Sequence, residues 1–305
     1  MAATLALALG ALAAPAQAGP DLVEDARIAW RAPGGIGSFS GLALSADGTR
    51  IITVSDKGSY VTATLERGED GTLSAVRADA YGPLLDPRGA PVQRYDVDAE
   101  GLAVGPDGEL FVSFEANHRV WAYTALDQPA RALPVPAAFR ALQNNSGLEA
   151  LFTGPDGALY TMPERSGELA RPYPVYRYDG AEWSTAFSLP RRPPHLMSGA
   201  DLGPDGRLYV VERHWNGFLS FSTRIRRFNV TPGGLSGEET LLESRLGLYD
   251  NLEGIATWRD PQGRTRLLLI SDDNESFLQA TELVEFIVEE PTPPRPQVRP
   301  RALLQ

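Results

Sequence analysis

One stretch of the chain, residues 98–115 with the sequence DAEGLAVGPDGELFVSFE, returns in four further versions. It predicts a β-hairpin, because a short apolar run precedes the turn Gly-Pro-Asp-Gly at 105–108 and the strand formers Leu-Phe-Val follow it. The two strands of a hairpin run in opposite directions, so the residues at its open end lie side by side. Glu100 and Glu115 should therefore share one edge, with the turn at the other.

The five versions align on the aspartate of the turn. The intervals are 60, 49, 49 and 55 residues between Asp47, Asp107, Asp156, Asp205 and Asp260. Periods of this length with short strands are typical of a β-propeller, in which four-stranded blades surround a central channel. The sequence therefore predicts an all-β fold with a single domain over residues 19–290.

Each of the first four hairpins is followed by two more strand-like runs, which gives every blade four strands. The runs are residues 60–65 and 73–78, 119–123 and 132–135, 174–178 and 183–189, and 224–230 and 239–242. The fifth hairpin is followed by one run only, residues 282–288, and residues 27–30 form a spare strand near the N-terminus. Pairing these two would close the ring and remove two exposed edges. We expect five blades, with six as the alternative, and a loop over residues 81–95.

The two ends of the chain differ from the repeats. Residues 1–18 are apolar, rich in small residues and end in Ala-Gln-Ala, which predicts a signal peptide, although the usual positive charges before the apolar run are missing. Residues 291–305 are rich in proline and predict a disordered or polyproline-like tail. No other run has the length of a membrane span. A periplasmic or secreted protein is expected, without disulfides because there is no cysteine.

The charge of the chain limits its partners. The formal net charge is −11 and the isoelectric point is near 4.9, which argues against nucleic acid or an anionic membrane surface as a partner. Cations are more compatible with this charge. We expect a monomer that acts on a small anionic molecule such as a phosphate ester.

Two rings of polar residues should meet at one end of the channel, which we call the mouth. The first ring comprises the residues that open the innermost strand of each blade: Ser40, Glu100, Glu149, Ser198 and Glu253. The second ring comprises the acids that end the second strand of each blade: Asp56, Glu115, Glu164, Glu212 and Asp272, with Asp273 and Asn274 beside the last. Carboxylates gathered in this way repel one another unless something positive lies among them.

Two sources of positive charge suit this mouth. Ca²⁺ takes six to eight oxygen ligands, which Asp, Glu and Asn side chains supply. Basic residues follow most acids of the second ring and would bind an anionic substrate: Lys57, His118, Arg119, Arg165, Arg213 and His214. The alternative is that the second-ring acids only pair with neighbouring arginines. His195 lies in a proline-rich loop and is not expected to be functional.

Several segments together resemble the phytase-like domain family, named for an esterase-like activity of phytase. They are SDKG at 55–58, SFEANHR at 113–119, NLEG at 251–254 and SDDN at 271–274, in this order. The resemblance implies an exported propeller with phosphoesterase chemistry, and it covers most of residues 34–288. The acids that it carries over are Asp56, Glu100, Glu115, Glu149, Glu164, Glu212, Glu253, Asp272 and Asp273. Ser198 and His214 depart from the family pattern, which puts a full ligand set on the fourth blade in doubt.

These observations lead to one main hypothesis and two alternatives. In the main hypothesis Glu100, Glu149, Glu253 and Asp272 hold the metal, which activates a water, while the basic residues bind the phosphate. The metal should lie off-centre, towards Glu100, Glu149 and Glu253. The first alternative is a non-catalytic binding propeller. The second is a metal-dependent lactonase or sugar-ester hydrolase, for which Asn251 and Asn274 would be further ligands.

Overall fold

The computed structural model describes residues 19–291, apart from 94–95, 116, 145, 218–219, 232, 275 and 277–278. The predicted signal peptide, residues 1–18, and all but the first residue of the predicted tail lie outside the described residues.

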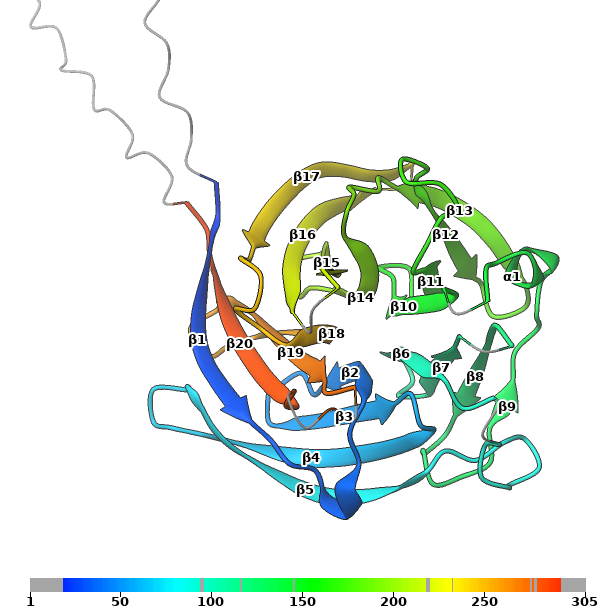
Figure 1. Ribbon diagram of the computed structural model, residues 1–305, viewed down its shortest axis with the longest axis horizontal. Coiled ribbons are helices and arrows are strands. Elements are labelled where there is room, and N and C mark those ends of the chain that lie inside the picture. The colour runs from blue at the N-terminus through cyan, green and yellow to red at the C-terminus, as the bar shows by residue number, and fades with distance from the viewer. Residues whose placement is uncertain are drawn as a thin grey trace, which may run out of the picture.

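The described chain forms five antiparallel sheets of four strands, arranged as blades around a central axis (Figure 1). This confirms the all-β propeller with five blades and rejects the alternative of six. Blade 1 contains β2 (Phe39–Leu44), β3 (Arg50–Ser55), β4 (Ser59–Arg67) and β5 (Leu73–Pro83). Blade 2 contains β6 (Ala99–Val104), β7 (Leu110–Phe114), β8 (Arg119–Tyr123) and β9 (Arg131–Ala132). Blade 3 contains β10 (Leu148–Thr153), β11 (Leu159–Pro163), β12 (Tyr173–Tyr178) and β13 (Trp183–Leu189).

Blade 4 contains β14 (Leu196–Leu202), β15 (Arg207–Trp215), β16 (Phe221–Thr231) and β17 (Gly234–Glu243). Blade 5 contains β18 (Asn251–Arg259), β19 (Thr265–Asp272), β20 (Glu282–Glu289) and β1 (Asp21–Ala29). Within the described ranges the only helices are the short α1 (Ala137–Arg140) and one 3-10 turn at Pro33–Gly35. None of the helices found there is long and apolar enough to cross a membrane.

The predicted strands agree with the observed ones except at the outer edges of the blades. The fourth strand of blade 2 is only Arg131–Ala132, shorter than the predicted run over 132–135. The fourth strand of blade 1 reaches Pro83 and so takes up the start of the predicted loop over 81–95. Outer strands have one solvent-facing edge, so their sequence pattern constrains their length least.

The ring is closed by the first strand of the chain. β1 pairs antiparallel with β20 from Asp21 opposite Glu289 to Ala29 opposite Glu282, which confirms the predicted closure. A buried ionic cluster lies at this junction, where both oxygens of Glu285 bind the two terminal nitrogens of Arg67 at 2.7 Å. Arg266 lies between Glu285 at 3.0 Å and Asp25 of β1 at 2.5 Å. The cluster therefore joins the first blade, the last blade and the closing strand.

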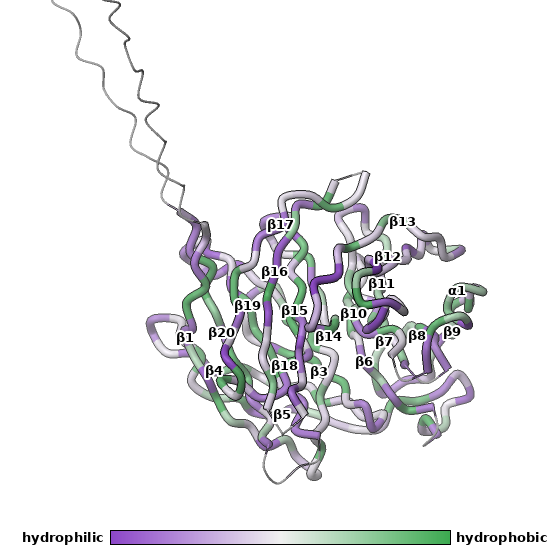
Figure 2. The backbone as a smooth tube through the Cα atoms, turned by 45° about the horizontal axis from the view of Figure 1, so that its top comes forward, coloured by the Kyte–Doolittle hydropathy of each residue, from purple (hydrophilic) through white to green (hydrophobic). Residues whose placement is uncertain are grey.

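Hydrophobic side chains fill the spaces between neighbouring blades. Within the described part of the chain they form five clusters, and each cluster combines residues of two adjacent blades. In the cluster between blades 1 and 2, for example, Val54 packs with Val112 and Phe114. Polar segments occur within blades too, and Figure 2 shows them along β16, which carries three arginines. Each blade therefore packs against a neighbouring blade on both of its faces, which buries the apolar side chains without the help of helices.

Glycines on the innermost strands let the blades approach closely. A Cβ added to Gly101 of blade 2 would lie 2.7 Å from the carbonyl oxygen of Glu149 in blade 3. A Cβ added to Gly41 would lie 2.8 Å from the carbonyl oxygen of Glu100. A Cβ added to Gly199 would lie 2.4 Å from the carbonyl oxygen of Glu253. A Cβ added to Gly254 would lie 2.7 Å from the carbonyl oxygen of Ser40, whereas in blade 3 the residue after Glu149 is Ala150. No side chain fits at these positions, so the glycine after the first-ring residue fixes the narrow centre of the propeller.

Candidate functional site

The first-ring residues point into the channel because each one sits on a β-bulge. The pairing register between the first and second strands shifts at all five positions, for example between Leu148 and Ala150 around Glu149, and between Leu252 and Gly254 around Glu253. A bulge places an extra residue in one strand and turns its side chain out of the regular alternation. The innermost strands are therefore built to direct one residue per blade towards the axis.

The first ring is buried and leaves little free space. Glu100, Glu149 and Glu253 are exposed by 7%, 2% and 3% respectively. The cavity lined by Glu100, Glu149, Ser40 and Ser198 has a volume of about 10 Å³, roughly the space that one water molecule needs. Ser198 uses its hydroxyl to bind the backbone carbonyls of Val211 and Leu252. A small ion fits this end of the channel, whereas an organic molecule does not.

The second ring differs from the prediction in blade 4. Glu115 and Glu164 stand eight residues after their turn aspartates, and the residue eight after Asp205 is Arg213. The register agrees, because Met162 and Val211 occupy equivalent pairs, which makes Arg213 the counterpart of Glu164. The second ring therefore consists of Asp56, Glu115, Glu164, Arg213 and Asp272.

Glu212 is turned away from the mouth, and placing it in the second ring was wrong. Its counterpart in blade 2 is Phe114, a core residue. The carboxylate of Glu212 is fully buried and binds Arg224 at 2.7 Å and Arg226 at 2.5 Å. Successive residues of a strand face opposite sides, so Glu212 and Arg213 cannot both reach the mouth. Glu212 is thus part of a buried ion-pair cluster inside blade 4.

Two histidines, His195 and His214, lie close to each other in blade 4. His214 faces His195 edge-on with 5.8 Å between ring centroids, and Nε2 of His195 lies 3.1 Å from the Ser222 hydroxyl. Burial and the nearby Arg224 lower the pKa of His195 to about 4. His195 is therefore neutral at physiological pH and packs as a polar core residue, and His214, predicted to bind substrate, lies beside it.

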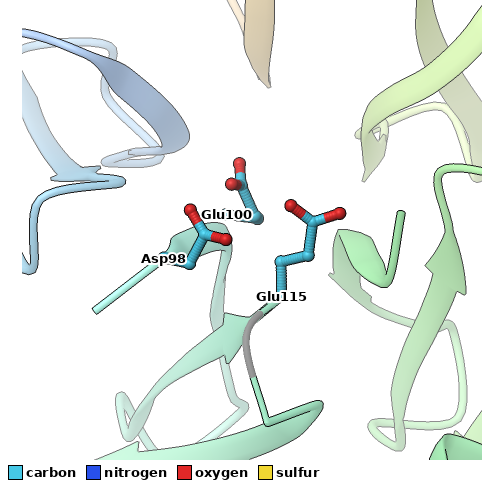
Figure 3. A group of neighbouring side chains, drawn as sticks. All are labelled: Asp98, Glu100 and Glu115. Atoms are coloured by element: carbon cyan, nitrogen blue, oxygen red, sulfur yellow. The ribbon is translucent and has the colours of Figure 1, made fainter. Parts of the chain in front are cut away.

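An acidic cluster lies on blades 2 and 3 at the mouth. Carboxylate oxygens of Asp98, Glu100 and Glu115 lie within 4.8 Å of one another, and so do those of Glu115, Glu149 and Glu164. Figure 3 shows the first three side chains turned towards a common point at the centre of the ring. The sequence interpretation missed Asp98, which stands two residues before Glu100 and whose backbone carbonyl accepts a hydrogen bond from the N–H of Glu115 at 2.8 Å. We call these five residues the acidic cluster.

Burial raises the pKa of these carboxyl groups. The pKa values of Glu100 and Glu149 lie well above the ordinary range because of burial and, next, the neighbouring carboxylates Glu253 and Glu100 respectively. Burial also raises the pKa of Glu115 to about 7, although the backbone N–H of Gly147 donates to it at 2.9 Å. These shifts mean that metal-free acids at the mouth hold protons more tightly than acids in water do.

The opposite side of the mouth contains its own cation. Arg213 lies 3.2 Å from Glu253 and 3.5 Å from Glu164, and it donates to the side-chain oxygen of Asn251 at 3.4 Å. Burial disfavours its charge, but Glu253 and then Glu149 more than compensate, so the pKa of Arg213 is raised. Asn251 in turn donates to Glu253 at 2.8 Å and to Asp272 at 3.3 Å. Asn251 is thus a fully buried link within blade 5.

The remaining predicted basic residues divide into two at the rim and two that pack inside. Lys57 pairs with Asp56 at 3.0 Å, and Arg165 pairs with Glu164 at 3.2 Å, with about half of each basic side chain exposed. Arg119 stacks on Phe114, 4.0 Å from the ring centroid, and burial lowers its pKa to about 10. His118 packs so closely that a Cβ at residue 147 would lie 2.0 Å from its Nδ1.

The residues after the last second-ring acid have different surroundings. Asp273 accepts a hydrogen bond from the backbone N–H of Ser38 at 3.0 Å and another from the Thr281 hydroxyl at 3.1 Å, so it fixes two loops. Asn274 is exposed, with a left-handed backbone at φ 49°, and its N–H donates to Asp272 at 2.6 Å. Of Asp272, Asp273 and Asn274, the residue that contacts Asn251 is Asp272.

The acidic cluster has the features of a site for a hard divalent cation. Oε2 of Glu149 and Oδ1 of Asp56 are buried and make no hydrogen bond with the described residues. A buried carboxylate oxygen without a partner is unfavourable, and a cation would satisfy it. The donor set is made of carboxylate oxygens, which Ca²⁺ prefers. The residues present thus fit Ca²⁺, with the cluster on blades 2 and 3 rather than around Glu253, which is paired with Arg213.

The raised pKa values predict how stability depends on pH without metal. The pKa is raised to about 7 for Glu253 and to about 6 for both Asp56 and Asp272, burial being the first cause in each. A folded-state pKa above the unfolded one favours folding at low pH, so this contribution is lost between about pH 4 and about pH 7. For Glu253 alone the shift corresponds to on the order of 3 kcal/mol at 1.4 kcal/mol per unit.

We therefore expect the melting temperature of chelated protein to fall by roughly 5 to 10 °C over that interval. Added Ca²⁺ should raise the melting temperature more at the upper end, because deprotonated ligands bind metal best. Differential scanning calorimetry with chelator and with Ca²⁺, in steps of pH, measures both effects. A melting temperature that rises with pH in the chelated protein would contradict the assignment.

Fold and site together define a five-bladed β-propeller with an acidic channel mouth that carries one internal arginine. Residues 34–275 match the phytase-like family, described as "Esterase-like activity of phytase", and this chain belongs to that family. No curated protein sequence matches the chain significantly.

Solved structures are similar to this chain at low sequence identity. The PQQ-bound aldose sugar dehydrogenase from Streptomyces coelicolor is 14% identical with a TM-score of 0.50, over 90% of this chain and 100% of that one. A gluconolactonase from Xanthomonas campestris is 17% identical with a TM-score of 0.48, over 89% of this chain and 98% of that one. At such identity the likeness to the dehydrogenase extends to the fold alone.

Proposed function

We propose that the protein is a Ca²⁺-dependent phosphoesterase of the phytase-like family, exported as a monomer and acting at the propeller mouth. The observation that carries this proposal is that the acidic cluster on blades 2 and 3 adjoins a guanidinium of blade 4. Arg213 lies 3.5 Å from Glu164 of the cluster and 3.2 Å from Glu253. A site for a cation beside a fixed guanidinium suits a substrate with several negative oxygens. The leader-like sequence of residues 1–18 supports export.

The chain's own residues have separate tasks in this proposal. Glu115 and Glu149 would hold the ion together with Glu164, and Asp98 and Glu100 would lie next to it. When bound, Ca²⁺ supplies positive charge that polarises the phosphate ester. The guanidinium of Arg213 binds the phosphate oxygens from the other side, and the rim residues Lys57 and Arg165 add positive potential at the opening.

Proton transfer is assigned to the acids on blade 5. The pKa values of Glu253 and Asp272, about 7 and about 6, suit groups that accept a proton from the attacking water near neutral pH. The carboxylate of Glu253 or Asp272 accepts a proton from the water, whose oxygen forms a bond to phosphorus while the ester P–O bond breaks. The departing alkoxide then takes up the proton that this carboxyl group holds. Asn251 keeps the two carboxylates in place, since its amide donates to both.

A substrate and metal screen of the purified protein tests the proposal. Elemental analysis should find Ca²⁺, and phosphomonoesters and phosphodiesters should be hydrolysed in Ca²⁺ but not after chelation. Sugar lactones serve as the comparison class, because lactone hydrolysis without phosphate release would support a lactonase instead. If chelation lowers the melting temperature and no ester of either class is hydrolysed, the protein is a binding propeller and the proposal is wrong.

A further inference from the structure

A second cavity opens beside the mouth, between blades 3, 4 and 5. Its volume is about 380 Å³, which is in the range of small-molecule pockets. It shares Glu164 and Arg213 with the second ring, and Arg165 and Asn274 are also in its lining. A phosphate held by Arg213 would therefore have its ester group next to this space. The cavity is large enough for a ring, unlike the narrow channel inside the first ring.

One wall of this cavity is apolar and comes from the hairpin that carries Arg213. Trp215 ends β15, stands two residues after Arg213 and so faces the same side of the strand. Phe221 begins β16 and pairs with Trp215 in the register, while Leu196 of β14 pairs with Arg213. Trp215, Phe221 and Leu196 all line the cavity. The guanidinium and the apolar wall are thus held in fixed positions relative to each other.

Trp215 is exposed in a way that the packing of the blades does not explain. Its exposed fraction is 60%. Trp30 and Trp258, in contrast, are buried, the first stacked on Phe39 and the second covered by Arg67. Among the described residues no aromatic ring stacks on Trp215. A large exposed aromatic face beside a cation-bearing mouth is the kind of surface on which a planar ring of a ligand stacks.

The charges of the cavity disfavour a substrate with many phosphates. Arg165 and Arg213 supply its positive charge, and both contact Glu164, which cancels part of it. A ligand with negative groups on every side would place some of them against Glu164 and others against the apolar wall. A ligand with one anionic group and an uncharged aromatic ring matches both parts of the surface.

We propose that this cavity binds an aromatic ring of the substrate, so that the preferred substrate class is a phosphate ester of an aromatic alcohol or nucleoside rather than an inositol polyphosphate. The inference rests on the proposed function for the position of the phosphate. Trp215 stacks on the ring, Phe221 and Leu196 complete the apolar wall, and Arg213 binds the phosphate.

Equilibrium binding of two non-hydrolysable probes tests this inference. Phenylphosphonate and methylphosphonate carry the same anionic group and differ in the ring, and isothermal titration calorimetry in Ca²⁺ compares them. We expect the phenyl compound to bind at least about ten-fold more tightly to the natural protein, in line with stacking of one ring on an aromatic side chain. Trp215→Ala should remove this preference, and Trp215→Phe should restore most of it.

The controls separate this inference from the proposed function. Tyr81→Ala removes a 53% exposed ring from β5 in blade 1 and should leave both affinities unchanged. Equal affinities for the two probes in the natural protein, or equal losses for both in Trp215→Ala, would overturn the inference. Hydrolysis of inositol hexakisphosphate in preference to phenyl phosphate would overturn it too, while leaving the phosphoesterase standing. Binding of phenylphosphonate that depends on Trp215, without any turnover, would support the cavity and reject the catalytic proposal.

Discussion

Replacing Glu149 with glutamine is expected to weaken Ca²⁺ binding by at least about 100-fold, the upper end of what the loss of a ligand's supporting partner costs. Glu149 is 2% exposed and its Oε2 has no hydrogen-bond partner within the described chain. Glutamine keeps the shape but loses the charge. Phosphoester hydrolysis should fall with the bound metal. The metal-free variant should at the same time be more stable at high pH, because the buried carboxyl group at position 149 no longer has to lose its proton.

In this variant the Ca²⁺ affinity should fall while the stability of the metal-free protein rises. An acid with only a structural role would not show both changes. Calorimetric titration with Ca²⁺ gives the affinity, and thermal unfolding in chelator gives the stability. Glu69→Gln is the matched control, since Glu69 is exposed and lies between β4 and β5, away from the mouth. Unchanged Ca²⁺ affinity in Glu149→Gln, or a metal-free variant that is less stable than the natural protein, would show that Glu149 holds no metal.

The Glu285→Gln variant is expected to lose about 3 to 5 kcal/mol of unfolding free energy, the usual cost of removing one partner of a buried ion pair. Glu285 is fully buried and faces Arg67 and Arg266. It also accepts a hydrogen bond from the indole N–H of Trp258 at 3.0 Å. Without the charge, the two guanidinium groups repel each other at the junction between blades 1 and 5.

Urea unfolding of the metal-free protein measures this loss. Glu109→Gln is the control, because Glu109 also binds an arginine, Arg131, at 2.8 Å, but 57% of that arginine side chain is exposed. Exposed pairs contribute about 0.2 to 1 kcal/mol. If both variants lose the same small amount, the closure of the ring does not depend on its ionic cluster.

Most of the fold could be predicted from the repeated hairpin. A turn of fixed composition at intervals of 49 to 60 residues defines blades, and the unpaired runs at the two ends define the closure. The sequence grouped Glu100, Glu149 and Glu253 because each stands seven residues before its turn aspartate, and each lies at a β-bulge of an innermost strand. Local spacing along one strand survives into the fold, since a strand has a fixed period.

The second ring shows where such reasoning stops. Aligning acids with acids placed Glu212 at the mouth, whereas strand alternation gives the position to Arg213. One residue of difference moves a side chain to the other face of a sheet. Counting from Asp205 would have found Arg213, but the pairing of Glu212 with Arg224 and Arg226 depends on β16 and is not visible in the hairpin.

Contacts between blades could not be predicted from the sequence, because they depend on residues far away in the chain. The sequence shows Glu-Gly at 100–101 and at 253–254. The reason for the glycine is the backbone carbonyl of the next blade, which approaches it too closely for a side chain. The stacking of Arg119 on Phe114 likewise follows from which face of blade 2 the guanidinium covers, and the sequence alone placed it at the mouth.

The closure of blade 5 by β1 also sets the order in which this molecule can be completed. Of the strands in the described part of the chain, β1 is synthesised first and β20 last, and these two strands pair with each other. Until β20 is available, one side of the incomplete blade presents an open strand edge, which is a site for association with other chains. Contacts so distant in the sequence form slowly. The ring can therefore close only once β20 is available, and a chain interrupted before β20 leaves β1 without this partner.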